Sequence, residues 1–492
     1  MYTPPPSWLA ISALLLNPAY AFYPYSPSFA NGVAPPSSRS LGAVSPDSNT
    51  RSLTLPIRRV PTRRQNDYNI VNSRDPKQAN SVAIDQDGKD ISYMVTVSFG
   101  DSKEEYHMLL DSAASNTWVM GQDCSTDACK MHNLFGKGDS SSLKTTTEPF
   151  SITYGTGSSS GNLATDTLHL GSLSPTLTFG LATNVSSEFR SYPMDGILGL
   201  GRGTSSPSTA SSETPQIMDI LTTTSLINSK IYALHLPRGS ALDGELNLGS
   251  INTERFSGSI NYTPCIPSST GFWEIPLSAA SVDGADVALA GSRTAIIDTG
   301  TSFILLPPAD ALVLHQKIKG YSQKGETFFI PCDTTAVMQF SFNKQTYNIS
   351  TADWVGEKVD AEGKICRSNV VGRKTFGETQ WLVGDTFLKN VYTVFDFEKS
   401  RVGLGVKVEG VDGVADGDAS SENGSGSASG SASGNGTVAT TSAAKGTMAP
   451  QNSGAATTSA AKAQDQQGGA DMYAVPLLLI MGVMGASLLV LM

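Results

Sequence analysis

Cysteine and basic residues are both scarce in this chain. Its 492 residues include only 5 Cys, and 34 Lys and Arg stand against 44 Asp and Glu. The resulting net charge of -10 argues against a nucleic-acid-binding protein, because phosphate recognition needs clustered Lys and Arg. Five cysteines without a CxxC pair are too few for a disulfide-dense scaffold or a structural zinc site. Hydrophobic residues make up 39%, which is enough to bury a sizeable core.

The N-terminal end has the pattern of a secreted protein. Residues 8–16 form an apolar run too short to cross a bilayer, and the small-residue pattern Ala19-Tyr20-Ala21 follows it. We therefore expect residues 1–21 to be a signal peptide, with an ordinary buried helix as the alternative.

Residues 22–79 are basic, with eight Lys and Arg against three Asp. A basic segment before an acidic body predicts a prosegment that neutralises the body until it is removed, and the alternative is a solvated linker. The dibasic pairs Arg58-Arg59 and Arg63-Arg64 are expected cutting sites for a processing protease.

The C-terminal end predicts a surface anchor. Residues 409–472 are rich in Gly, Ser and Ala, which is typical of a flexible stalk, and residues 473–492 are an apolar tail with no basic residue after it. A small-residue site, a polar spacer and an apolar tail together predict a GPI-attachment signal, with Ser459 as the first candidate site and Asn452 as the second. The alternative is a tail-anchored helix. We expect the secretory pathway to deliver the protein to the cell surface, GPI-anchored to the plasma membrane or cell wall.

The body between these ends predicts a mostly β protein. Residues 93–99, 150–154 and 167–170 alternate apolar and polar positions with β-branched and aromatic residues, which indicates strands. Helices are expected only near residues 216–221 and 308–319.

An internal repeat divides the body into two lobes. Residues 109–115 align with 296–302 at an offset of 187, and residues 197–199 align with 382–384 at an offset of 185. Two features at nearly the same offset predict two similar structural units. We place the N-terminal lobe at residues 80–255 and the C-terminal lobe at residues 256–408.

Each copy of the repeat places one carboxylate, Asp111 or Asp298, after an apolar strand. Two carboxyl groups brought close together share one proton, because like charges cannot both ionise cheaply. The ionised group can take a proton from water while the protonated one donates to a carbonyl oxygen. The neighbouring hydroxyl residues Ser112 and Thr299 are placed to brace the two loops.

Several motifs resemble those of pepsin-like aspartic proteases, in the family's order over residues 88–408. They are residues 152–157 (ITYGTG), 194–201 (MDGILGLG), 298–302 (DTGTS), 381–388 (WLVGDTFL), 394–396 (VFD) and 402–404 (VGL). With the GPI-type tail, the chain is most similar to the fungal secreted, yapsin-like branch. The resemblance implies a bilobal fold with pseudo-twofold lobes and a central cleft, made as a zymogen. It further implies a monomer that takes peptide and protein substrates and uses no metal or organic cofactor.

The resemblance also implies roles for individual residues. Asp111 and Asp298 would activate water, Tyr154 with Gly155 would form the tip of a mobile flap, and Trp118 would support that tyrosine. The implied bracing residues are Ser112, Thr299 and Thr301, and the implied disulfides are Cys124–Cys129 and Cys332–Cys366, which leaves Cys265 over.

The first catalytic motif departs from the family pattern at Ala113 and Ala114. Ala114 lacks the hydroxyl that would bond the outer oxygen of Asp111, so we expect a raised Asp111 pKa and an acid limb shifted upward. The alternative function is a catalytically impaired homologue that acts as a surface peptide-binding or wall glycoprotein.

Two further patterns bear on the surface and on rival chemistries. Residues 157–161 match the G-x-S-x-G elbow of serine hydrolases, but a strand is expected to follow where that elbow needs a helix. Five N-x-S/T sequons predict glycosylation sites at Asn184, Asn261, Asn348, Asn423 and Asn435.

Overall fold

The computed structural model describes residues 68–155, 157–203, 214–267 and 270–408. The expected signal peptide, most of the expected prosegment, the stalk and the apolar tail lie outside these residues. So do the candidate attachment sites Ser459 and Asn452 and the sequons at Asn423 and Asn435. Within the described residues, no helix has both the length and the hydropathy to span a membrane.

The N-terminal half is built on an eight-stranded sheet in the order β2-β3-β4-β9-β5-β8-β7-β6. Its strands are β2 (Asp85–Gln86), β3 (Tyr93–Phe99), β4 (Tyr106–Asp111), β5 (Trp118–Met120), β6 (Lys144–Thr153), β7 (Ser158–His169), β8 (Thr176–Val185) and β9 (Gly196–Gly199). The one α-helix described in this half is α1 (Ile217–Thr223). The expected strand at residues 93–99 is confirmed, and β7 continues through the G-x-S-x-G motif as a strand.

The C-terminal half contains a five-stranded sheet and two four-stranded sheets. The first has the order β13 (Glu274–Leu277), β16 (Arg293–Ile297), β25 (Gln380–Val383), β17 (Ile304–Leu306) and β24 (Val370–Gly372). The second is β15 (Ala285–Asp286), β14 (Ala279–Val282), β20 (Met338–Phe342) and β21 (Gln345–Ile349), and the third is β18 (Ser322–Lys324), β19 (Thr327–Pro331), β23 (Ile365–Ser368) and β22 (Val355–Lys358). The helices are α2 (Pro308–His315), α3 (Thr351–Trp354) and α4 (Asp385–Leu388).

The pairing of strands repeats between the halves, as the sequence predicts. Strand β4 runs parallel to β9, which is antiparallel to β5, and β5 is parallel to β8. In the second half β16 runs parallel to β25, which is antiparallel to β17, and β17 is parallel to β24. The duplicated, mostly β, bilobal architecture is therefore confirmed.

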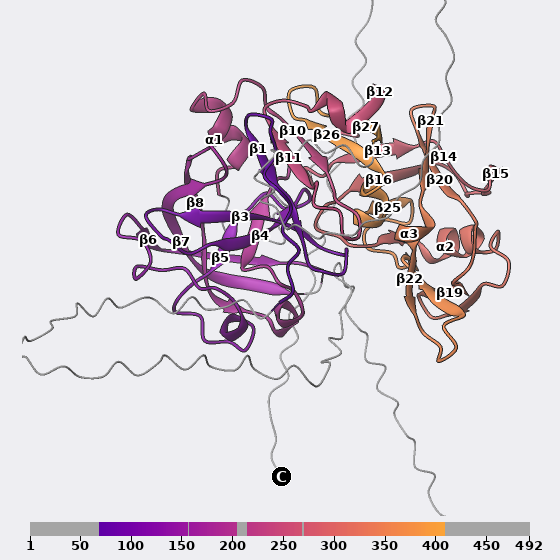
Figure 1. The fold of residues 1–492 in the computed structure, drawn as a ribbon, viewed down its shortest axis with the longest axis horizontal. Helices are drawn as coiled ribbons and strands as arrows, with labels where there is room; N and C mark the ends of the chain where they lie inside the picture. The colour runs from indigo at the N-terminus through magenta and orange to yellow at the C-terminus, as the bar shows by residue number, and fades with distance from the viewer. Residues whose placement is uncertain (1–67, 156, 204–213, 268–269, 409–492) are drawn as a thin grey trace, which may run out of the picture. The chain divides into compact units, whose positions relative to one another are not determined.

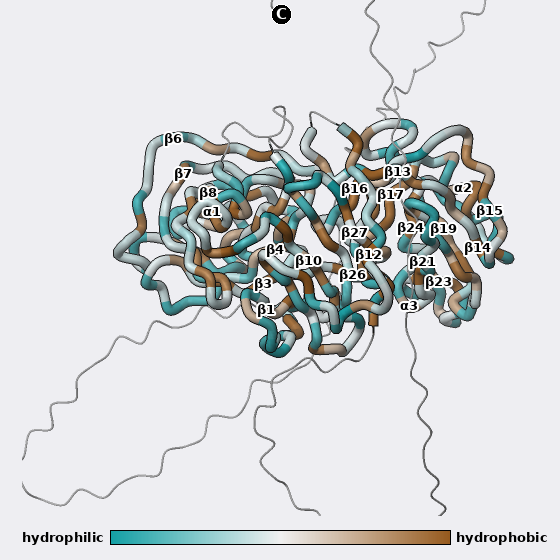
Figure 2. Tube along the Cα trace, turned by 90° about the horizontal axis from the view of Figure 1, so that it is seen from above, coloured by the Kyte–Doolittle hydropathy of each residue, from teal (hydrophilic) through white to brown (hydrophobic). Residues whose placement is uncertain are grey.

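A six-stranded antiparallel sheet joins the halves. Its order is β1 (Ser81–Ala83), β11 (Glu245–Leu248), β10 (Ile231–His235), β26 (Val391–Asp396), β27 (Arg401–Lys407) and β12 (Phe256–Pro264). Strand β10 of the first half pairs with β26 of the second, and both lie between the two halves in Figure 1. One hydrophobic core runs through this sheet into both halves, with hydrophilic stretches at outer turns such as that near β15 (Figure 2).

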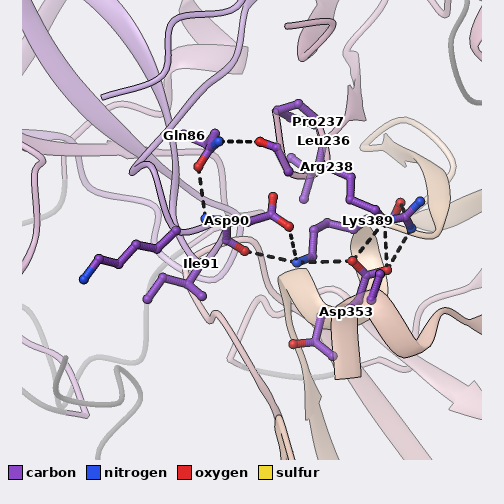
Figure 3. Close-up of polar contacts among 12 residues, drawn as sticks. Gln86, Asp90, Ile91, Leu236, Pro237, Arg238, Asp353 and Lys389 are labelled. Atoms are coloured by element: carbon purple, nitrogen blue, oxygen red, sulfur yellow. Dashed lines mark hydrogen bonds and ion pairs between the residues drawn. The ribbon is translucent and has the colours of Figure 1, made fainter. Parts of the chain in front are cut away.

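A buried ion cluster also ties the halves together (Figure 3). The Lys389 ammonium, after α4, lies 2.8 Å from an Asp90 carboxylate oxygen before β3 and 3.3 Å from one of Asp353 in α3. Arg238, after β10, donates to the same Asp353 carboxylate at 2.7 Å. Tyr93 donates its hydroxyl to Asp90 at 2.6 Å. Four segments that are distant in sequence therefore depend on one buried lysine.

We predict that Lys389→Met lowers the free energy of unfolding by about 3 kcal/mol, because removing the cation leaves the buried Asp353 and the half-buried Asp90 without their shared partner. Denaturant unfolding followed by fluorescence measures this loss. Lys364→Met is the matched control, since Lys364 pairs with Glu362 on the surface, where both side chains are at least 70% exposed, and such pairs contribute little. Equal losses in the two variants would contradict the role assigned to the cluster.

Candidate active site

Two equivalent loops present the two carboxylates. Asp111 is the last residue of β4, and Asp298 directly follows β16. The side chains are almost completely buried, at 4% and 5% exposure. The loops approach so closely that a Cβ on Gly300 would lie 2.7 Å from the carboxyl carbon of Asp111, so only glycine fits there.

Reciprocal hydrogen bonds lock the loops together. The backbone N–H of Ser112 donates to the Thr299 hydroxyl at 3.0 Å, and the N–H of Thr299 donates to the Ser112 hydroxyl at 3.0 Å. Each hydroxyl then donates to the carbonyl just before the opposite aspartate, Ser112 to Ile297 at 3.0 Å and Thr299 to Leu110 at 2.9 Å. Both side chains are fully buried, so these bonds fix the separation of the carboxylates in a place that water does not reach.

The hydrogen bonds to the two carboxylates are unequal. One oxygen of Asp111 accepts from the backbone N–H groups of Ala113 and Ala114, at 2.9 and 2.8 Å. Asp298 accepts from the N–H of Gly300 at 2.8 Å and from the Thr301 hydroxyl, on its other oxygen, at 2.6 Å. Asp298 therefore has a hydroxyl donor on its second oxygen. The residue equivalent to Thr301 in the Asp111 loop is Ala114, which has no hydroxyl to offer.

Burial raises the pKa of both carboxyl groups above the ordinary aspartate value. For Asp111 the negative charge of Asp298 raises the pKa further, against the two backbone N–H bonds. For Asp298 the bonds from Thr301 and Gly300 oppose the rise in pKa. The two groups share one proton, and the hydroxyl bond from Thr301, which Ala114 cannot supply to Asp111, favours the charge on Asp298 and the proton on Asp111.

The family model for eukaryotic aspartyl proteases matches residues 92–407, which is most of the body. The chain belongs to the eukaryotic aspartyl protease family. It is 45% identical to the aspartic-type endopeptidase ctsD of Aspergillus fumigatus over 361 residues, which is 73% of this chain and 74% of the relative. A probable aspartic-type endopeptidase CTSD of Arthroderma benhamiae is 42% identical over 364 residues, 73% of this chain and 70% of the relative. Pepsin A of Sus scrofa is 33% identical over 323 residues, which is 64% of this chain and 81% of the relative. The enzyme class expected from the sequence, an aspartic-type endopeptidase, is confirmed.

An aromatic group stands beside the protease dyad. Tyr154 follows β6 and closes the β6–β7 hairpin with a bond from its N–H to the Gly157 carbonyl at 2.7 Å, with the exposed Gly155 next to it. The indole N–H of Trp118 donates to the Tyr154 hydroxyl at 2.7 Å. Burial raises the pKa of Tyr154, and the negative charge of the nearby Asp111 raises it further.

Phe189 is a residue of this group that the sequence did not single out. It lies in the short 3₁₀ helix η2 (Ser187–Ser191), and its ring packs edge-on against Trp118 at 5.4 Å and against Tyr154 at 6.2 Å. In the sequence, Phe189 is marked only as an aromatic residue shortly before the 194–201 motif, which does not indicate that it contacts Trp118 or Tyr154.

The disulfides implied by the family are present. Cys124 pairs with Cys129 and Cys332 with Cys366, which leaves Cys265 as a half-buried free thiol. No group of His, Cys, Asp and Glu in the described part of the chain has the geometry of a metal site.

Three of the sequons lie in the described strands. Asn184 and Asn348 are exposed and open to glycosylation. Asn261 is half-buried, and its side-chain nitrogen, the atom that a glycan would modify, donates to the Phe342 carbonyl at 2.8 Å. Glycosylation of all three stays a prediction, and a glycan on Asn261 would have to be accommodated in this half-buried setting.

The unequal bonding predicts how the pH–rate profile responds to two single substitutions. In Ala114→Ser a hydroxyl can donate to Asp111, so its pKa falls and the alkaline limb of kcat/KM moves down by about one pH unit. This size follows because a hydrogen bond to a charged group contributes about 1.5 kcal/mol and one pKa unit equals about 1.4 kcal/mol. The alkaline limb responds because Asp111 holds the proton, whereas the sequence alone had pointed to the acid limb.

Thr301→Val is the complementary variant. It removes the hydroxyl bond to Asp298, so the pKa of Asp298 rises and the acid limb moves up by a similar amount. Peptide cleavage measured from about pH 3 to 8 resolves both limbs. A profile that stays in place in both variants would rule out hydroxyl bonding as the source of the asymmetry.

Proposed function

We propose that this protein is a secreted, surface-anchored, yapsin-like aspartic endopeptidase that hydrolyses peptide bonds at acidic pH, with Asp111 and Asp298 as the catalytic dyad. The observation that carries the proposal is the braced pair of carboxylates, of which one favours the ionised form and the other retains a proton. A water held between them is activated without a metal ion or an organic cofactor.

The reaction follows from the protonation of the pair. The Asp298 carboxylate takes a proton from water, the water oxygen bonds to the carbonyl carbon, and Asp111 donates its proton to the carbonyl oxygen. Asp298 then passes its proton to the amide nitrogen, Asp111 takes one back from the tetrahedral diol, and the C–N bond breaks. The dyad returns to its singly protonated state.

Tyr154 is proposed to close over the substrate as a flap residue. Its hydroxyl accepts a hydrogen bond from Trp118, whereas the neighbouring Gly155 is exposed. The side chain of Tyr154 is therefore anchored, and the turn of the hairpin is accessible to substrate. Closure excludes water from the dyad and strengthens its electrostatic interactions.

The direct test is cleavage of a peptide library by the processed protein and by Asp298→Asn, which we expect to lower kcat by about 10³-fold because the general base is lost. Asp286→Asn, an exposed residue in β15, is the control and should keep full activity. A pepstatin-type statine should inhibit the parent enzyme. A folded, processed protein that binds the statine but cuts no peptide would favour the alternative, a catalytically impaired peptide-binding or wall glycoprotein.

The two disulfides and the two ends of the chain support the proposed location. Disulfides form in oxidising compartments, which agrees with secretion directed by the expected signal peptide at residues 1–21. We propose that a processing protease releases the basic prosegment at a dibasic pair and that the mature enzyme is a monomer held by a GPI anchor.

We predict that phosphatidylinositol-specific phospholipase C releases the full-length protein from intact cells, and that a chain ending at Lys407 appears in the medium. Immunoblots of the cell and medium fractions measure both. Protein that stays in the membrane after phospholipase treatment would indicate a tail-anchored helix instead. Protein confined to the cell interior would overturn the proposed secretion.

A further inference from the structure

A stretch of chain before the matched family region is bound to the protease body. The family model begins at residue 92, yet residues 68–78, here called the strap, make regular contacts with the first half and the shared sheet. The sequence had placed these residues in the removable prosegment. The contacts described below hold them against the folded body.

The middle of the strap is held by hydrogen bonds. Val71 pairs with Gln86 in both directions, at 2.8 and 3.0 Å, and the side chain of Gln86 accepts from the Asp90 N–H beside the ion cluster (Figure 3). The N–H of Ser73 donates to Asp85 at 2.8 Å and its hydroxyl to the Ile84 carbonyl at 2.6 Å. The far end is fixed by Gln78, which donates to the Ser250 hydroxyl at 3.0 Å.

The front of the strap carries an aromatic anchor. The Tyr68 ring lies 5.3 Å from the ring of His132, and its hydroxyl donates to the backbone carbonyl of Arg190. His132 is 2% exposed, and its two ring nitrogens each lie 2.8 Å from a backbone carbonyl, one of Ala128 and one of Tyr192. Tyr68 and His132 together thus join the strap, the loop of the Cys124–Cys129 disulfide and the η2 turn.

The η2 turn is the support of the flap tyrosine. Phe189 directly precedes Arg190, whose carbonyl accepts from Tyr68, and lies three residues before Tyr192, whose carbonyl contacts His132. Its ring packs against both Trp118 and Tyr154. Ile70 of the strap packs against the same core cluster that contains Trp118 and Phe189. A continuous set of contacts therefore runs from the strap through η2 to the side chain beside the dyad.

We propose that the strap remains on the mature enzyme and that Tyr68 is a positioning residue, which acts through His132 and Phe189 to hold Tyr154 and Trp118 in the geometry that binds substrate. Cleavage after Arg63-Arg64 would make Tyr68 the fourth residue of the mature enzyme and keep the whole strap, whereas removal of residues 22–79 would delete it. The inference rests on the endopeptidase activity proposed above.

The first experiment is N-terminal sequencing of the active enzyme secreted from the full chain. A mature N-terminus before Tyr68 is the expected result. A mature N-terminus at or beyond residue 79 would overturn the proposal, because the active enzyme would then have no strap.

The second experiment compares Tyr68→Ala, Tyr68→Phe and the control Asn72→Ala, an exposed residue of the strap. We expect Tyr68→Ala to raise KM for peptides about fivefold with little change in kcat, and Tyr68→Phe, which keeps the ring on His132, to recover most of the loss. Asn72→Ala should match the parent. A Tyr68→Ala variant that loses only thermal stability, with KM unchanged, would reduce Tyr68 to a structural role and contradict the proposal.

A readout that needs no catalysis separates this inference from the proposed function. Hydrogen exchange at the backbone of residues 187–192 should become faster in Tyr68→Ala and remain unchanged in Asn72→Ala. If the parent protein is inactive but shows this exchange pattern, the endopeptidase mechanism is wrong, while the strap still stabilises η2. If the exchange of residues 187–192 does not change in Tyr68→Ala, the strap does not stabilise η2, and the proposal is wrong even if the enzyme is active.

Discussion

The reciprocal pair of bonds between Ser112 and Thr299 is the constraint on which the rest of this protein depends. Each residue gives a backbone N–H to the other's hydroxyl, and each hydroxyl continues to the carbonyl before the opposite aspartate. These contacts bring together two loops that lie at the ends of strands in different halves of the molecule. Without them, the two carboxylates would move apart, because their negative charges repel each other and each carboxylate is better solvated in water than when buried.

The remaining architecture can be understood as support for this contact. The shared six-stranded sheet sets the halves in register, and the ion cluster around Lys389 holds the segment before β3 to α3 and α4. Within that frame, small differences decide the chemistry. In the proposed mechanism, the hydroxyl at Thr301 and its absence at Ala114 make Asp298 the base and Asp111 the acid, although the strands that deliver them are paired alike.

Much of the site could be predicted from the sequence because its features are local or repeated. The offset of 187 residues identified both aspartates and their bracing partners, and alternation identified strands such as β3. The Lys389–Asp90 pair joins residues 299 positions apart and has no local signal. Phe189 and the contacts of residues 68–78 have no local signal for the same reason, and the Asn261 sequon does not reveal the bond from its amide to the Phe342 carbonyl. Contacts made only by tertiary packing leave no periodic pattern to read.

The reciprocal bonds imply that Ser112 and Thr299 act as one unit, and a double-mutant cycle on kcat is the most direct measurement of that coupling. Ser112→Ala, Thr299→Val and the double variant would be assayed at the pH optimum, with folding checked by circular dichroism. Each substitution removes two of the four bonds. Because losing either pair lets the loops move apart, we expect the double variant to lose little more activity than the worse single variant. Losses that simply add would show that the two hydroxyls act independently and would contradict the account.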